Sequence, residues 1–344
     1  MPRALVTGAT GLLGSYLVRR LIADGWQVRA LVRRPAAAAN LTTLGVELHA
    51  GDVLDLPRFA DAARDCDALF HGAAVVTDRG GWEAYRTPNV DGTRNAVTAA
   101  ARAGARLLHV SSVAVYGPAA RYEHGPGSVT EDTPLAPLPR AAFYARSKRD
   151  SEAVVMAAHQ RGEVWATAIR PDVLYGRRDR QFVPRVARLV SHGVVPVVDG
   201  GTAVLPVIHA ANVADAAVRA VCCDAAGGRA YLTANDADVT AAEFFRLAGE
   251  GLGRVPRLVP VPLALMKLGV MAATAGLTLI GARGLAVMAG QSAEFLSAGN
   301  PFSSQRARTE LGWTPPVHPR DGVPDAFRWW HDRREHRRSG AEGG

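Results

Sequence analysis

A tyrosine and a lysine four residues apart, Tyr144 and Lys148, are the strongest candidates for chemistry in this chain of 344 residues. Only two of its 40 Lys and Arg residues are lysines, Lys148 and Lys267, so a lysine at this spacing stands out. On a helix, residues i and i+4 share a face. A cationic lysine beside a tyrosine favours the phenolate, so the pair predicts a tyrosine of lowered pKa that exchanges protons with a substrate.

Two consecutive serines, Ser111 and Ser112, can supply the hydroxyl that polarises a substrate oxygen in such a site. They end an apolar run at 106–112 that predicts a buried strand. Open α/β sheets bind ligands at the carboxyl ends of their strands, so the serines are expected at that edge. The alternative is that these hydroxyls only satisfy the backbone of the loop.

Three glycines, Gly8, Gly11 and Gly14, stand where the first predicted strand gives way to the first predicted helix. A tight turn needs a residue that tolerates positive φ, and close approach to a pyrophosphate needs one without a side chain. The helix that follows offers backbone N–H groups to the phosphates. The turn therefore predicts a dinucleotide site, whose other residues are Thr10, Leu12 and Leu13.

Apolar runs of strand length alternate with helix-length segments over the first half of the chain. Predicted strands lie at 3–8, 27–32, 46–52, 68–74, 106–112 and 164–171, and helical patterns lie at 14–25 and 89–104. Strands this apolar are buried on both faces, so the fold class is α/β, a Rossmann-type doubly wound parallel sheet. Past residue 172 the alternation weakens, which predicts a smaller, mainly helical C-terminal substrate-binding region.

These patterns divide the chain into parts. Residues 1–171 are expected to form the dinucleotide-binding domain, with a returning segment at about 203–234. Residues 172–202 and 235–325 are expected to form the substrate-binding region, and residues 326–344 a basic, flexible tail.

The Gly-x-x-Gly-x-x-Gly turn together with Tyr-x-x-x-Lys resembles the short-chain dehydrogenase/reductase superfamily. The chain length and the segment at 306–316 resemble its extended branch, the NAD-dependent epimerase/dehydratase family, and especially its dihydroflavonol reductases and 3β-hydroxysteroid dehydrogenases. The resemblance runs from residue 1 to about 316. It implies that Ser112, Tyr144 and Lys148 are catalytic, with Ser111 as the alternative serine.

The same resemblance implies dinucleotide contacts beyond the glycine turn. Tyr144, Lys148 and Ser111 would also contact the cofactor. The family pattern would place Asp52 and Val53 at the adenine edge, and Ala73 and Ala74 on the ribose side. It would place Pro171 and Val173 at the nicotinamide amide. In contrast, His209 and Asp215 match positions that are structural in the family.

The end of the second predicted strand indicates which nicotinamide cofactor is used. An NAD site carries a carboxylate there to accept hydrogen bonds from the ribose, whereas this strand runs into Arg33 and Arg34. A guanidinium can bind a 2′-phosphate bidentately, and the resemblance to NADP-preferring reductases agrees. We therefore predict NADP(H), with NAD(H) as the alternative.

The leading functional expectation is an NADP(H)-dependent oxidoreductase that reduces a ketone or aldehyde, or oxidises the secondary alcohol. A nucleotide-sugar epimerase or dehydratase with tightly bound NAD is the second candidate. Dehydratases of the family carry an acidic pair after the catalytic serine, and this chain has Val113 and Ala114 there. A non-catalytic dinucleotide-sensing regulator is the third, and it would be expected to have lost the tyrosine or the lysine.

The substrate is expected to be a mainly apolar small molecule. Sugar-nucleotide members of the family usually place a diphosphate-binding arginine four residues before the histidine at 209, where this chain has Leu205. An apolar side chain cannot bind a diphosphate. The apolar stretch at 256–290 fits pocket lining, core packing or contact with a membrane, and these alternatives stay open.

The amino-acid composition further restricts the class of protein and the partners expected for it. Hydrophobic residues make up 48% and charged residues 21%, as in an ordinary globular protein. The net charge of +8 brings no nucleic-acid-binding motif with it, so no nucleic-acid partner is expected. Three cysteines offer neither a disulfide framework nor metal-ligand spacing. We expect a cytoplasmic enzyme without a metal or a transmembrane segment, and a homodimer is left open.

Overall fold

The computed structural model describes residues 1–76, 80–117, 125–234, 237–266, 268–269, 271–272 and 299–339. Its centre is a seven-stranded sheet with the order β10-β6-β5-β4-β1-β2-β3, and every neighbouring pair is parallel. The strands are β1 (Arg3–Thr7), β2 (Gln27–Val32), β3 (Glu47–Ala50), β4 (Ala68–His71), β5 (Arg106–Val110), β6 (Ala166–Pro171) and β10 (Ala230–Thr233). The predicted α/β fold is confirmed.

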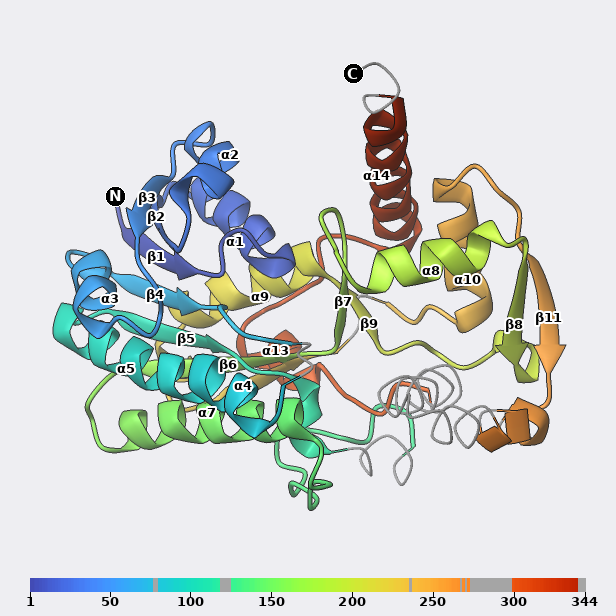
Figure 1. Ribbon diagram of the computed structural model, residues 1–344. Helices are drawn as coiled ribbons and strands as arrows, with labels where there is room; N and C mark the ends of the chain where they lie inside the picture. Colours follow the sequence, from blue (N-terminus) through green and yellow to red (C-terminus); the bar gives the residue numbers. More distant parts are fainter. Residues whose placement is uncertain are drawn as a thin grey trace.

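Helices cover both faces of this sheet (Figure 1). One face carries α1 (Leu12–Ala23) and α9 (Ala210–Cys222), and the other carries α3 (Leu56–Ala63), α5 (Gly92–Ala103) and α7 (Phe143–Gln160). Successive side chains of a strand point to opposite faces. In β1, Val6 accordingly packs under α1 and α9, whereas Leu5 packs under α3 and α5.

Local sequence signals fix two of the helix boundaries. Gly104 adopts a left-handed conformation with φ of +65° and ends α5. The proline-rich stretch before residue 140 cannot be helical, and α7 begins at Phe143, directly after it. The prediction that Tyr144 and Lys148 lie one turn apart on a helix is therefore confirmed.

The C-terminal region has its own small sheets and its own core. Strand β7 pairs with β9, and β8 pairs with β11, each in parallel. The core is aromatic, with Tyr175, Phe244 and Phe327 fully buried. The elements of this region are β7 (Val173–Tyr175), α8 (Phe182–Ser191), β8 (Val194–Val198), β9 (Val207–His209), α10 (Ala241–Gly251), β11 (Arg257–Val261) and α14 (Pro319–Ser339). The described residues also include the short helices α2 (Ala39–Thr42), α4 (Trp82–Arg86) and α13 (Gln305–Glu310).

The predicted boundary of a flexible tail at residue 326 is wrong. Helix α14 continues to Ser339, and Ala326 and Phe327 are fully buried against α10 and its neighbours. The apolar spacing from Val323 to Phe327 places these side chains on one helical face, which anchors the first half of α14. Its last turns project from the body of the protein (Figure 1).

Much of the apolar stretch at 256–290 lies outside the described residues. In its described part, the side chains of Leu265, Leu268 and Met271 are exposed. None of the described helices combines the length and the apolar content that crossing a bilayer requires.

Candidate active site

The glycine turn joins β1 to α1 with no room for side chains. Gly8 has φ of +73°, and a Cβ atom on it would lie 2.9 Å from the backbone nitrogen of Ala73. A Cβ atom on Gly14 would lie 2.2 Å from the carbonyl oxygen of Gly8. Gly11 precedes the first residue of α1 with an extended backbone and provides no side-chain cap. The first N–H groups of α1 therefore have no side-chain cap, and such donors at a helix start suit the phosphates of a ligand.

Ser112 and Tyr144 meet although they are 32 positions apart in the chain. Ser112 follows β5, and its hydroxyl accepts a hydrogen bond of 3.2 Å from the backbone of Ala114. The Ser112 hydroxyl lies close to the phenol of Tyr144 and lowers the pKa of Tyr144. The structure thus brings together the serine that the family resemblance selected and the tyrosine.

The pKa of Tyr144 nevertheless moves in the direction opposite to the prediction. Burial raises it above the ordinary value, and this effect exceeds the lowering by Ser112, while Tyr85 adds a further increase. The Lys148 ammonium is not among the groups that shift it. Burial is a tertiary effect, which the spacing of two residues along a helix cannot reveal.

Lys148 lies inside the protein with 4% of its surface exposed. Its Nζ donates a hydrogen bond of 2.7 Å to the carbonyl oxygen of Val110, the last residue of β5. Burial lowers the pKa of Lys148 to about 8, because the interior disfavours the charged form, and the Glu152 carboxylate opposes this shift. The Lys148 amine therefore lies at the carboxyl end of the sheet, and its pKa is close to physiological pH.

A chain of buried polar groups connects the glycine turn with the start of α7. Thr7 Oγ1 lies 2.9 Å from His71 Nδ1, and His71 Nε2 lies 3.1 Å from Thr93 Oγ1, which donates to the carbonyl oxygen of Asn89. Asn89 Nδ2 donates to Ser147 Oγ at 2.9 Å, and that hydroxyl donates to the carbonyl oxygen of Tyr144. Each buried donor that finds an acceptor in this way helps to fix the first turn of α7.

A buried ion pair supports the next turn of α7. Arg170 Nε of β6 donates to Glu152 Oε2 at 3.0 Å, and Arg170 Nη1 donates to the Tyr116 hydroxyl at 2.5 Å. Glu152 follows Lys148 by one helical turn. Neither this pair nor the polar chain was predicted, because their contacts between two side chains join residues 18 or more positions apart in sequence. Asn89, a polar residue at the start of a predicted helix, was the sequence signal that could have indicated these buried polar contacts.

Residues 4–232 match the NAD dependent epimerase/dehydratase family. The chain belongs to this family. It is an NAD(P)-dependent oxidoreductase of the short-chain dehydrogenase/reductase type, as its sequence resemblance indicated.

Relatives of this family member include two named reductases. The 2-alkyl-3-oxoalkanoate reductase of Shewanella oneidensis is 30% identical, over 93% of this chain and 84% of the relative. The ceramide reductase of Caulobacter vibrioides is 34% identical, over 75% of this chain and 73% of the relative. The solved structure of UDP-glucuronic acid 4-epimerase from Bacillus cereus in complex with NAD has a TM-score of 0.72 over 97% of this chain and 98% of the epimerase. At 17% identity, that likeness shows the fold alone.

The other predicted cofactor residues of this family member lie at the carboxyl edge of the sheet. Arg33 follows β2 and is exposed. Beyond β3, Asp52 Oδ1 accepts from the Leu54 backbone at 3.0 Å, and the Val53 carbonyl oxygen accepts from Asn95 at 2.9 Å. The remaining predicted residues all follow or end a strand of this sheet: Ala73 and Ala74 after β4, Ser111 after β5, Pro171 at the end of β6 and Val173 at the start of β7.

Two observations fit a dinucleotide at this edge. No side chain caps the first N–H groups of α1, which directly follow the glycine turn. The Ser111 hydroxyl is buried and has no hydrogen-bond partner within the described part of the chain. An unsatisfied buried hydroxyl costs free energy unless a ligand or water completes it. In the described residues, no His, Cys, Asp or Glu groups are arranged to hold a metal ion.

Two residues outside the site have structural contacts. His209 is buried between the rings of Tyr16 and Tyr175, and its Nδ1 accepts from the backbone of Ala211. Burial lowers the pKa of His209 to about 4, so it is neutral at physiological pH. Asp215 pairs with Arg20 at 2.9 Å, which joins α9 to α1.

Proposed function

We propose that this protein reduces the ketone or aldehyde group of a mainly apolar small molecule with NADPH, or oxidises the corresponding secondary alcohol. The observation that carries the proposal is the approach of the Ser112 hydroxyl, after β5, to the phenol of Tyr144 on α7 at the carboxyl edge of the sheet. Lys148 lies one turn along the same helix. A hydroxyl, a phenol and an ammonium in this arrangement suit proton transfer to a carbonyl oxygen.

In this proposal each residue has one task. When bound, the nicotinamide supplies the hydride that the carbonyl carbon accepts. Tyr144 gives its proton to the carbonyl oxygen, and Ser112 donates a hydrogen bond to the same oxygen as negative charge develops. The raised pKa of Tyr144 keeps the phenol protonated at neutral pH, as a proton donor must be. Lys148 provides a positive charge near the phenolate that forms.

We assign the cofactor contacts by the family pattern. The turn from Gly8 to Gly14 would hold the pyrophosphate through the N–H groups of α1. Asp52 and Val53 would lie at the adenine, and the backbone at Ala73 and Ala74 would lie at the ribose. The Ser111 hydroxyl would form a hydrogen bond with the cofactor, and Pro171 and Val173 would contact the nicotinamide amide.

Three observations support an apolar carbonyl substrate. Leu205, at the position of the sugar-nucleotide arginine, is buried in the core of the C-terminal region. Val113 and Ala114 stand where dehydratases carry acids. The names of two relatives, 2-alkyl-3-oxoalkanoate reductase and ceramide reductase, also describe molecules with long alkyl chains. A nucleotide-sugar epimerase remains the second candidate, because the matching family also comprises epimerases and dehydratases.

Turnover with two kinds of substrate tests the proposal. The purified protein is expected to consume NADPH with a long-chain 3-oxo compound and to consume none with UDP-glucose. Interconversion of UDP-sugars without net consumption of NADPH would instead favour the epimerase.

Replacement of Arg33 tests the choice of cofactor. Arg33→Ala is expected to lower the ratio of kcat/KM with NADPH to that with NADH by about tenfold or more, because a charge-assisted bond to the 2′-phosphate is lost. Arg102→Ala, an exposed arginine on α5, is the matched control and should leave the ratio unchanged. An unchanged ratio in Arg33→Ala would contradict the assignment.

A further inference from the structure

The loop after β7, residues 176–181, holds an arginine in an unusual backbone conformation. Arg178 has φ of +74°, in the left-handed region that residues other than glycine rarely adopt. Such a residue costs about 1 kcal/mol of strain and is retained where the surroundings require it. Its side chain is half-buried. A strained, half-buried cation calls for a functional explanation.

Three more arginines surround Arg178. Arg19 of α1, Arg180 of the same loop and Arg333 of α14 lie near enough that their charges, together with burial, lower the pKa of Arg178. Within the described residues, none of these four arginines forms an ion pair with a carboxylate. Gathered cations without a counter-ion repel one another, and an anion bound among them would relieve that repulsion.

The acidic residues of this neighbourhood are already engaged. Asp325 pairs with Arg177, with 2.8 Å between Arg177 Nε and the carboxylate. The Asp179 carboxylate accepts hydrogen bonds from the backbone N–H groups of Gln181 and Val183 at 2.7 and 2.9 Å. In the part of the chain that the structure describes, neither carboxylate forms an ion pair with any of these four arginines.

The loop is fixed over the helix that follows the glycine turn. The Arg177 backbone N–H donates to the Tyr16 hydroxyl of α1 at 2.8 Å. A Cβ atom on Gly176 would lie 3.0 Å from the same hydroxyl oxygen, so the loop packs closely on α1. The backbone of this loop is thereby held against the dinucleotide-binding domain.

Arg178 reaches from this loop to the segment that follows β2. With the Asn40 amide oriented so that its oxygen faces the guanidinium, that oxygen accepts from both terminal nitrogens of Arg178, at 3.1 and 3.2 Å. Asn40 belongs to α2, seven positions after Arg33 in the same connection between β2 and β3. The side chain of Arg178 therefore lies beside the segment that carries the predicted 2′-phosphate contact.

We propose that Arg178 is a second recognition residue for the ribose 2′-phosphate of NADP(H), contributed by the C-terminal region to the site of Arg33. This inference rests on the proposed use of NADP(H). A phosphate monoester is the anion that a planar guanidinium binds bidentately. The neighbouring arginines raise the local positive potential, which favours the cofactor that carries the additional phosphate.

Ligand binding tests this role without any need for turnover. The probes are adenosine 2′,5′-bisphosphate and adenosine 5′-monophosphate, which differ only in the 2′-phosphate. Arg178→Gly removes the guanidinium and suits the positive φ, so the fold should be retained. We expect its Kd for the bisphosphate to rise about tenfold and its Kd for the monophosphate to stay unchanged. Arg178→Lys should give an intermediate value.

Controls separate this inference from the proposed function. Arg188→Ala, an exposed arginine on α8, should change neither Kd. If the wild-type protein prefers the bisphosphate and Arg178→Gly keeps that preference in full, the inference is overturned while the use of NADP(H) stands. If the wild-type protein binds both probes equally, both fail. Inorganic phosphate binding that depends on Arg178, without an effect on the bisphosphate, would indicate a separate anion site and would also overturn the inference.

Discussion

Tyr144→Phe is expected to lower kcat for carbonyl reduction by about 10²–10⁴-fold, the range that loss of a general acid produces. The variant lacks only the hydroxyl that donates the proton, and its ring still fills the same space beside Ser112. Binding of NADPH, measured by fluorescence titration, should change little. The expected signature is thus a loss in kcat with an almost unchanged Kd for the cofactor.

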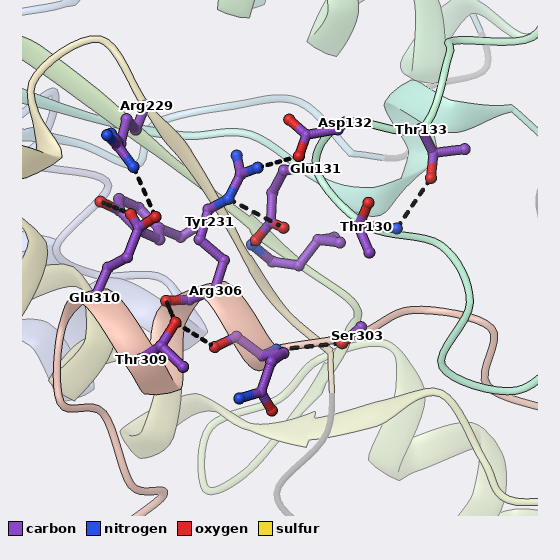
Figure 2. Close-up of polar contacts among 12 residues, drawn as sticks. Thr130, Glu131, Asp132, Thr133, Arg229, Tyr231, Ser303, Arg306, Thr309 and Glu310 are labelled. Atoms are coloured by element: carbon purple, nitrogen blue, oxygen red, sulfur yellow. Dashed lines mark hydrogen bonds and ion pairs between the residues drawn. The ribbon is translucent and has the colours of Figure 1, made fainter.

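Another tyrosine serves as a control for this substitution. The Tyr231 hydroxyl on β10 donates to Glu310 Oε2 of α13 at 3.0 Å, remote from Tyr144 in sequence (Figure 2). Tyr231→Phe removes a phenolic hydroxyl of the same kind and should retain turnover. Full activity in Tyr144→Phe would remove the phenol from the mechanism.

Lys148→Met should weaken both cofactor binding and turnover, with kcat lower by about 10²-fold or more through the loss of the positive charge near the phenolate. Methionine has nearly the same length and can occupy the buried space of the Lys148 side chain. Lys148→Arg should not restore activity, since a rigid guanidinium cannot replace a point-like ammonium in a closed space. Retention of both kcat and NADPH affinity in Lys148→Met would contradict this account.

Thermal unfolding across pH shows whether Lys148→Met keeps its fold. The pKa of Lys148 is about 8 in the folded protein, below the ordinary value of 10.5. Between these values the unfolded chain binds more protons, so Lys148 makes the free energy of unfolding rise with pH in that window. The methionine variant lacks this contribution and should be at least as stable as the wild-type protein near pH 7. Its expected loss of activity would then be chemical.

Local signals in the sequence were sufficient to predict the fold of the central sheet and its helices. Apolar runs predicted the strands of the sheet. Glycines that adopt positive φ indicated the turn after β1 and the end of α5, and prolines indicated the start of α7. The course of α14 was missed because the basic residues after Phe327 concealed the apolar face that anchors the helix.

Local sequence signals could not predict the burial and the polar contacts of the site residues. The raised pKa of Tyr144 results from burial by segments remote in sequence. Asn89 and Ser147 are 58 positions apart, and Arg178 contacts Asn40 across 138 positions, as their numbers show. Such pairs depend on the way the sheet and the C-terminal region pack together. A pattern within one segment does not contain that information.

The fate of the hydride tests the central claim most directly. NADPH carrying deuterium at both hydrogen positions of nicotinamide C4 is incubated with the purified protein and a long-chain 3-oxo compound, and the product is examined by mass spectrometry. The account predicts one deuterium on the new carbinol carbon for the wild-type protein and almost none in the same time with Tyr144→Phe. A product without deuterium, or equal labelling by the two proteins, would contradict it.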